Sequence, residues 1–175
     1  MEIQFINVRQ IGPAQMQKLR ACLPAGRLRE LDALADPLPH LCAEALARQM
    51  LGEKQKKAPD AVVITRTEHG KPLTEGIYFS LSHSGEWAVC ALSDCPIGVD
   101  LEYRRDTVPA HLQRRLGTGD PEEFFRRWTA MEARVKCLGS TVFHWQEFLE
   151  DPAGCATEEI QAPEGYAATV CLKTK

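Results

Sequence analysis

The chain has 175 residues, of which 44% are hydrophobic and 26% charged, as is typical of one globular domain or of two small lobes that share a core. Its formal net charge of −3 gives no overall basic field, so we expect neither nucleic acid nor a membrane as a partner. The N-terminus lacks the basic start and long apolar run of a signal peptide, and no apolar stretch approaches the ~20 residues of a membrane helix. We therefore expect a cytoplasmic protein.

The first half of the chain predicts helices enclosed by strands. We expect, in chain order, a strand over 1–8, a helix begun by Pro13, a helix around Leu28 to Leu34, a helix over 38–51 that Gly52 ends, a strand over 61–66, and strands over 77–82 and 87–93. The last two strands are joined through Ser84-Gly85-Glu86, which is a hairpin signal.

The second half predicts a strand, one strong helix and a closing hairpin. We expect strands over 97–103, 156–161 and 166–173. Asp120 can cap the helix, Pro121 suits its first turn, and Glu123 completes a capping box. Its apolar stripe consists of Phe124, Trp128, Met131, Val135 and Leu138, with Gly139 at its end. Strands and helices thus mix in both halves, which predicts an α+β protein with antiparallel pairing.

The cysteines fit a reducing compartment. There are seven, an odd number with scattered spacing, which argues against a disulfide framework. Cys90, Cys95 and Cys137 stand in apolar or turn settings and have no C-x-x-C partner. We expect them to be small buried or half-buried side chains and not metal ligands.

The first segment with chemical potential is Gly98-Val99-Asp100-Leu101-Glu102. Residues two apart on a strand point to the same face, so Asp100 and Glu102 present two carboxylates side by side. Such a pair repels itself unless a cation or a proton lies between the two groups, and oxygen ligands suit magnesium. An edge strand with a solvent-exposed acidic face would show the same sequence pattern.

The second segment is Trp128-Thr129-Ala130-Met131-Glu132-Ala133-Arg134-Val135-Lys136. Its residues Trp128, Glu132 and Lys136 are spaced four apart and share one face of a helix. That face borders the apolar stripe, so Glu132 and Lys136 should lie near a lobe boundary. An ordinary helical ion pair is the alternative interpretation.

Together with Gly70-Lys71-Pro72 and Ser80-Leu81-Ser82-His83-Ser84, these segments form an ordered series. The series resembles the motifs of the 4'-phosphopantetheinyl transferase superfamily. The match is close over residues 70–136, and residues 165–171 resemble the closing strand of the family.

The resemblance implies the larger, monomeric class, which folds as two similar α+β lobes about a pseudo-twofold axis. The lobes would span residues 1–97 and 98–175, with coenzyme A in the cleft between them. Each lobe would be a small, mostly antiparallel sheet packed on a helix. The enzyme would transfer the phosphopantetheine arm of coenzyme A to a serine of an acyl, polyketide or peptidyl carrier protein and release 3',5'-ADP.

The resemblance assigns Asp100, Glu102 and Glu132 to magnesium, with manganese as a substitute. Asp100, Glu132 and Lys136 would be the catalytic residues. Glu132 would accept the serine proton, directly or through water, and Lys136 would contact the transferred phosphate. Binding of coenzyme A falls to residues similar to the phosphate and nucleotide contacts of the family: Lys71, Pro72, Ser82, His83 and Arg27.

Three positions depart from the family pattern, namely Leu41, Met131 and Ser140. We expect these changes to affect affinity for coenzyme A more than the chemistry. Two alternative functions stay open at this point. One is a non-catalytic member that binds a carrier protein or coenzyme A, and the other is an unrelated magnesium phosphohydrolase.

Overall fold

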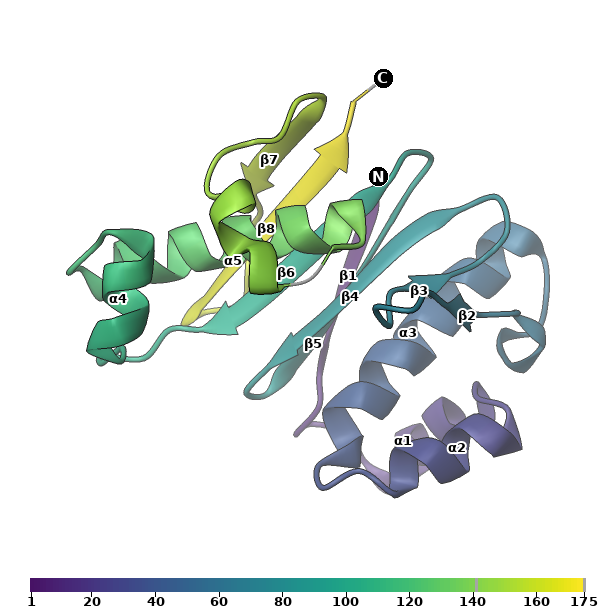
Figure 1. Ribbon diagram of the computed structural model, residues 1–175. Helices are drawn as coiled ribbons and strands as arrows, with labels where there is room; N and C mark the ends of the chain where they lie inside the picture. Colours follow the sequence, from purple (N-terminus) through teal and green to yellow (C-terminus); the bar gives the residue numbers. More distant parts are fainter. Residues whose placement is uncertain (141, 175) are drawn as a thin grey trace. The chain divides into compact units, whose positions relative to one another are not determined.

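The computed structural model describes residues 1–140 and 142–174 (Figure 1). The chain divides into two compact units, Met1–Asp94 and Cys95–Lys175, whereas the sequence suggested a division between residues 97 and 98. The whole of the strand that carries Asp100 therefore belongs to the second unit. Both units contain helices and a small antiparallel sheet, which confirms the α+β class.

The first unit is built around one long helix and a three-stranded sheet (Figure 1). Its elements are β1 (Glu2–Asn7), α1 (Pro13–Ala21), α2 (Ala25–Asp32), α3 (Pro37–Gln55), the 3-10 helix η1 (Pro59–Ala61), β2 (Thr65–Arg66), β3 (Pro72–Leu73), β4 (Tyr78–Ser84) and β5 (Trp87–Ser93). The sheet has the order β1-β5-β4, with both neighbours antiparallel to β5, and β2 and β3 form a separate small hairpin. The helix α3 packs on β4 and β5.

The end of α3 corrects the sequence prediction, because the helix continues past Gly52 to Gln55. Its C-cap is Lys56, in the left-handed conformation with φ 53°. The next residue folds back, so that the Lys57 N–H donates to the Gly52 carbonyl at 2.9 Å. A Cβ at position 52 would lie only 2.8 Å from the Lys57 carbonyl oxygen. Gly52 therefore makes room for the returning chain and does not end the helix.

The strand predicted over residues 61–66 is mostly wrong. Only Thr65–Arg66 is a strand, and Pro59–Ala61 is a 3-10 turn in which the Ala61 N–H donates to the Ala58 carbonyl at 3.0 Å. Val62 is buried against the core that contains Met50 and Leu51. The β-branched side chain at position 62 is thus used for packing and not for sheet pairing.

The second unit contains the strong helix and a second three-stranded sheet (Figure 1). Its elements are β6 (Ile97–Tyr103), α4 (Ala110–Leu116), α5 (Pro121–Leu138), the 3-10 helix η2 (Val142–Phe148), β7 (Cys155–Glu159) and β8 (Tyr166–Lys173). The strand order is β6-β8-β7, again antiparallel, and α5 packs across β6 and β8. The strands at 97–103 and 166–173 confirm the prediction, whereas α4 was not expected.

The ends of α5 follow the predicted signals in part. The Asp120 carboxylate accepts a hydrogen bond from the Glu123 N–H at 3.0 Å, and Gly139 ends the helix with φ 67°. The other half of the predicted capping box is wrong, because the Asp120 N–H donates to Thr118 Oγ1 at 3.2 Å. Leu138, expected in the apolar stripe, is 38% exposed.

The two units share one order of elements. Each begins with a strand (β1 or β6), continues through helices to a long helix (α3 or α5), and closes with a hairpin (β4–β5 or β7–β8). In each sheet the last strand lies in the middle, between the first strand and the other strand of the hairpin. This repetition supports the expected similarity of the two lobes, while the pseudo-twofold axis stays a prediction.

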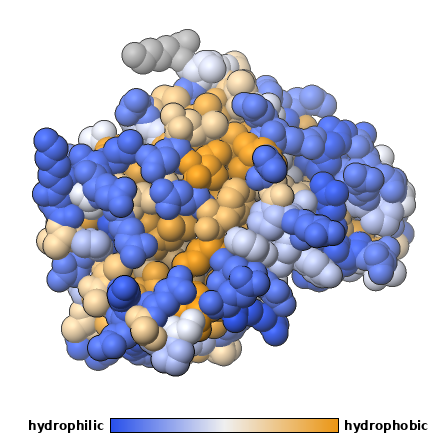
Figure 2. All heavy atoms as spheres, turned by 180° about the vertical axis from the view of Figure 1, so that it is seen from behind, coloured by the Kyte–Doolittle hydropathy of each residue, from blue (hydrophilic) through white to orange (hydrophobic). Residues whose placement is uncertain are grey.

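Hydrophilic residues cover much of the face seen in Figure 2, and hydrophobic residues reach the surface among them. The exposed large hydrophobic side chains come from separate parts of the chain, for example Met1, Val63 and Tyr103. Across residues 1–140 and 142–174, the helices are too short or too polar for a membrane span.

Candidate functional site

Asp100 and Lys136 form the centre of the candidate site in the second unit. Lys136 Nζ lies 2.7 Å from Asp100 Oδ1, and the side chains are 29% and 5% exposed. Asp100 comes from the middle of β6 and Lys136 from the last turn of α5. The structure thus joins the two segments that the sequence marked as chemically active.

A glycine in β6 allows this close approach. A Cβ at position 98 would overlap the Ala133 carbonyl and the Cys137 N–H of α5. Gly98 therefore lets the backbone of α5 lie directly on β6, two residues before Asp100. This contact sets the depth at which Glu132 and Lys136 reach the sheet.

A buried pair of threonines fixes the register of α5 on the sheet. The hydroxyls of Thr129 and Thr169 lie 2.8 Å apart, and the Thr129 hydroxyl also lies 3.0 Å from the Phe125 carbonyl. Thr169 in β8 pairs with Asp100 in β6. Because opposite residues of an antiparallel pair share a sheet face, the threonine pair positions α5 above the strand position of Asp100.

Glu132 titrates in an environment rich in negative charge. Burial, and next the negative charge of Asp100, raise the pKa of Glu132 to about 7, while Lys136 lowers it and Glu102 raises it further. Glu102 itself is half-buried on the same strand as Asp100. Asp100 and Glu102 on the strand therefore act electrostatically on Glu132 on the helix.

These carboxylates fit a hard divalent cation by their chemistry. The ligand set is made of oxygens only, which magnesium prefers over nitrogen or sulfur. Burial and the charges of Asp100 and Glu102 raise the pKa of Glu132 against the opposing effect of Lys136, and a cation beside these carboxylates would favour the ionised form of Glu132. Asp100, Glu102 and Glu132 are accordingly the residues that could hold such an ion.

In the first unit, His83 is next to a second histidine. His83 Nε2 lies 3.3 Å from His40 Nδ1, and the two rings meet edge to face with centroids 4.3 Å apart. His83 and the buried Ser82 are near the end of β4, whereas His40 comes from the first turn of α3. Hydrogen bonding between the two rings requires one nitrogen to donate and the other to accept.

Lys71 and Pro72 lie at the β2–β3 hairpin. The Thr67 N–H donates to the Lys71 carbonyl at 2.9 Å, and the Lys71 N–H donates to Thr67 Oγ1 at 3.1 Å. Both residues are half-buried. The turn chemistry read from Gly70 is confirmed by its positive φ of 81°.

Arg27 belongs to a charge network around a buried carboxylate. Its guanidinium lies 2.7 Å from Glu44 and 2.7 Å from Glu30. Glu44 also pairs with Arg48 at 3.2 Å and with Arg66 at 3.3 Å. Glu44, Arg48 and Arg66 were missed by sequence reasoning. The spacing of Glu44 and Arg48, four apart within an apolar helix, was the available signal.

The three unusual positions have structural roles. Met131 is 1% exposed in the core of α5, and Leu41 is 2% exposed in the core under α3. The Ser140 N–H donates to the Val135 carbonyl at 3.0 Å and so completes the end of α5. These side chains or backbone groups thus stabilise the helices that carry the site.

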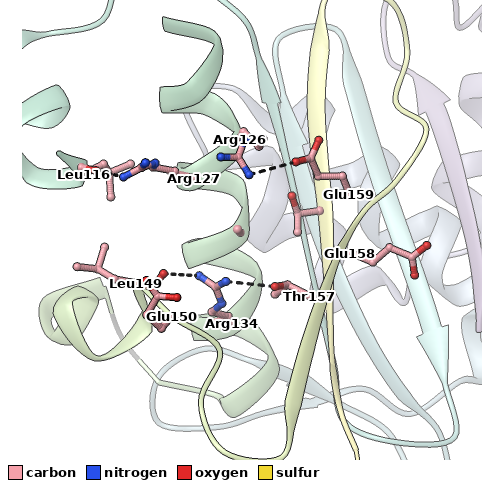
Figure 3. A pocket seen from close by; sticks show the side chains of 11 residues that line it. Leu116, Arg126, Arg127, Arg134, Leu149, Glu150, Thr157, Glu158 and Glu159 are labelled. Carbon is pink, nitrogen blue, oxygen red and sulfur yellow. Dashed lines mark hydrogen bonds and ion pairs between the residues drawn. The ribbon is translucent and has the colours of Figure 1, made fainter. Parts of the chain in front are cut away.

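A pocket of about 460 Å³ lies along α5 and the β7–β8 hairpin (Figure 3). Arg134 spans it, with contacts to Asp151 at 2.7 Å and Thr157 at 3.1 Å, and Arg126 lies 3.7 Å from Glu159. The lining described for this pocket contains none of the three candidate metal carboxylates.

Comparison with known proteins gives a consistent set of relatives, although no protein-family model matches the chain. The chain is 31% identical over 162 residues to 4'-phosphopantetheinyl transferase Sfp of Bacillus subtilis (strain 168), covering 75% of this chain and 72% of the relative. It is 32% identical over 161 residues to 4'-phosphopantetheinyl transferase ffp of Bacillus subtilis, with the same coverage of 75% and 72%.

A third relative is matched over a shorter part. The chain is 28% identical over 121 residues to 4'-phosphopantetheinyl transferase gsp of Aneurinibacillus migulanus, covering 62% of this chain. The alignment spans 51% of that relative, about half its length.

Proposed function

The chain belongs to the 4'-phosphopantetheinyl transferase family, and we propose that it transfers the phosphopantetheine arm of coenzyme A to a serine of a carrier protein. The observation that carries the proposal is the Asp100–Lys136 pair at 2.7 Å, together with the electrostatic effect of Asp100 and Glu102 on Glu132. Nothing among these observations supports the non-catalytic alternative. The same relatives weigh against an unrelated phosphohydrolase.

The proposed reaction is a displacement at the phosphorus that carries the pantetheine arm. The serine hydroxyl oxygen forms a new bond to this phosphorus, and the bond from phosphorus to the bridging pyrophosphate oxygen breaks. The leaving group departs as 3',5'-ADP with the electron pair of that bond. The serine proton goes to a base, for which Glu132 is the candidate in the second unit.

Glu132 suits this task because a general base works best when its pKa lies near the operating pH. Burial and the charge of Asp100 raise the pKa of Glu132 to about 7. Its carboxylate is therefore a stronger base than an exposed glutamate.

We assign Asp100, Glu102 and Glu132 to a magnesium ion, with manganese as a substitute. When bound, such an ion neutralises pyrophosphate and stabilises charge on the leaving group. Asp100 is paired with Lys136 at 2.7 Å. Lys136 would exchange this carboxylate for an oxygen of the transferred phosphate, where its positive charge stabilises the transition state.

For coenzyme A we propose contacts from Lys71, Pro72, Ser82, His83 and Arg27 of the first unit. Arg27 forms ion pairs with Glu30 and Glu44. Together with Arg48 and Arg66 around Glu44, it would attract the phosphates of coenzyme A. We also propose that the protein is a cytoplasmic monomer whose macromolecular partner is an acyl, polyketide or peptidyl carrier protein.

The test is transfer itself. The protein is incubated with coenzyme A, magnesium and several apo carrier proteins, and each carrier is weighed by mass spectrometry. We expect one carrier at least to gain the mass of phosphopantetheine. No gain on any carrier, beside a working control enzyme, would contradict the proposal.

A matched pair of variants tests the site. Glu132→Gln should abolish transfer, whereas Glu122→Gln, an exposed glutamate on the same helix, should retain it. Full transfer by Glu132→Gln would remove this carboxylate from the mechanism.

A further inference from the structure

Three cysteine side chains of the second unit meet between α5 and the β7–β8 hairpin. The sulfur atoms of Cys137, Cys155 and Cys171 all lie within 4.8 Å of one another. They come from the last turn of α5, the first residue of β7 and the second half of β8. None of the three forms a disulfide.

The sheet register explains why these side chains converge. Cys171 lies opposite Gly98 in β6 and opposite Thr157 in β7. Opposite residues share a face, and so do residues two apart on one strand, which puts Cys155 on the face of Thr157 and Cys171. Gly98 allows the α5 backbone at Cys137 to press on that same face. The cluster therefore follows from the closest contact between helix and sheet.

Two of the three thiols are buried and the third is half-buried. Cys171 is 0% and Cys137 2% exposed, whereas Cys155 is only half-buried at the edge strand. The hydrogen bond with Cys137, and next burial, raise the pKa of Cys171. Burial, followed by the Cys137 thiol, raises the pKa of Cys155. These shifts favour the neutral thiols of Cys155 and Cys171 in the metal-free cluster, and an ion could reach the cluster past Cys155.

Contrary to the expectation from the sequence for Cys137, we propose that Cys137, Cys155 and Cys171 form a binding site for one thiophilic metal ion, Zn²⁺ or Cu⁺. Ligand sulfurs around zinc lie about 2.3 Å from the metal, so neighbouring sulfurs in a tetrahedral site are about 3.8 Å apart. The present separations need to close by about 1 Å at most. Thiolate ligands select zinc and monovalent copper over magnesium.

The ligand count distinguishes this site from a common structural zinc site. Among residues 1–140 and 142–174, no aspartate, glutamate or histidine joins the three thiols within the same distance. A structural zinc site has four protein ligands, so here a fourth position is left to water or another small ligand. Three thiolates alone also suit the low coordination number of monovalent copper.

The site is separate from the carboxylates in its chemistry. Soft thiolates and hard carboxylates prefer different ions. A metal bound to the thiols would join the end of α5, directly after Lys136, to β7 and β8. Its expected effect is therefore on the stability of the second unit and does not depend on transferase activity.

The experiment uses the full chain, reduced and freed of metal. Samples are exposed to Zn²⁺ or, without oxygen, to Cu⁺, then desalted and assayed for metal and protein. We expect about one equivalent of one of these ions, with a thiolate-to-metal absorption band when Co²⁺ replaces Zn²⁺. We also expect a rise in Tm on addition of the ion that binds, because a ligand of the folded state stabilises it.

Variants identify the ligands. Cys155→Ser should abolish the bound equivalent of metal, the cobalt band and the shift in Tm. Because Cys155 is half-buried, we expect this substitution to change the stability of the metal-free protein little. The control is Cys95→Ser, which changes another half-buried cysteine of the same unit and should keep the bound metal, the cobalt band and the shift in Tm. Glu132→Gln should also keep them, and this variant tests whether the carboxylates bind the ion instead. Cys171→Ala is a second ligand test, and if it fails to fold the Cys155 variant decides.

Two outcomes would overturn the site. The first is a wild-type chain that retains neither ion after desalting. The second is retention of the same amount of metal, with the same cobalt band, by Cys155→Ser. Retention must also fall as the pH is lowered, because the thiols release protons when they bind metal.

Discussion

The two units use one order of strands and helices but balance their charges in opposite ways. In the first unit, Glu44 is contacted by Arg27, Arg48 and Arg66, so guanidinium groups surround a single buried carboxylate. In the second unit, Asp100 pairs with Lys136, and Glu102 and Glu132 add further carboxylates nearby.

This difference suggests a division of tasks within a repeated architecture. The arginine-rich network favours an anion such as a phosphate, and the carboxylate-rich cluster favours a cation. Packing explains why the second unit can hold its carboxylates so close to a helix. Gly98 brings the α5 backbone onto β6, whereas α3 is separated from its sheet by side chains such as Met50 and Phe79.

Gly98→Val should have the largest effect, because it removes the contact peculiar to the second unit. The new side chain would overlap the α5 backbone at Ala133 and Cys137. We expect a loss of about 4 kcal/mol or more in the free energy of unfolding, measured by urea denaturation. Gly119→Ala, where an added Cβ meets no atom within 4 Å, should change stability little. Equal stability of the two variants would disprove the close contact.

Glu44→Gln should be next in size and acts on the first unit. It leaves the three arginines around position 44 without their shared carboxylate. Removing one partner of a buried ion pair costs about 3–5 kcal/mol, and the partial exposure of Arg27 and Arg66 places the expected loss at the lower end. Thermal unfolding measures it, with the exposed Glu53→Gln on the same helix as control. A loss as small as that of the control would contradict a buried network.

Glu132→Gln should make the protein more stable while it removes activity. The folded pKa of Glu132 is raised from 4.5 to about 7, so the folded state holds a proton that the unfolded state releases. Stability from this group is present below pH 4.5 and is lost as the pH rises to about 7, by at most about 3 kcal/mol. The free energy of unfolding, measured from pH 5 to pH 8, should therefore fall less steeply with pH in Glu132→Gln than in wild type or Glu122→Gln. Parallel curves of the free energy of unfolding against pH for wild type and Glu132→Gln would show that the pKa of Glu132 is not raised. Added magnesium should reduce the difference in slope between the two proteins.

The smallest expected effect compares the caps of the two long helices. Asp120 accepts a hydrogen bond from Glu123 N–H at the start of α5, whereas Asp36 makes no side-chain cap bond at the start of α3. Asp120→Ala should cost about 1 kcal/mol, and Asp36→Ala should cost clearly less. Differences in Tm between these variants check the prediction, and equal losses would contradict it.

Much of the second unit was predictable from local signals. The sequence correctly predicted the strand that carries Asp100, the closing strand, and the two ends of α5 at Asp120 and Gly139. These signals are local, because strand alternation, helix capping and a glycine in the left-handed conformation each involve only a few neighbouring residues. The strand expected over residues 61–66 failed because Val62 is held by core packing, which local β-propensity does not encode. The predicted end of α3 was wrong for a similar reason, because Gly52 makes room for the backbone of Lys57, which folds back onto the helix.

The sequence by itself determined the α+β class, the family and the residue types of the candidate chemistry, because these depend on short ordered motifs. Only the tertiary structure decided which charges meet. Lys136 contacts Asp100 because Gly98 and the Thr129–Thr169 pair set the depth and register of α5. Arg27 faces Glu44, and three scattered cysteines converge on one face of a sheet. Such contacts join distant segments and arise from helix–sheet packing, for which no spacing along the chain is a signal.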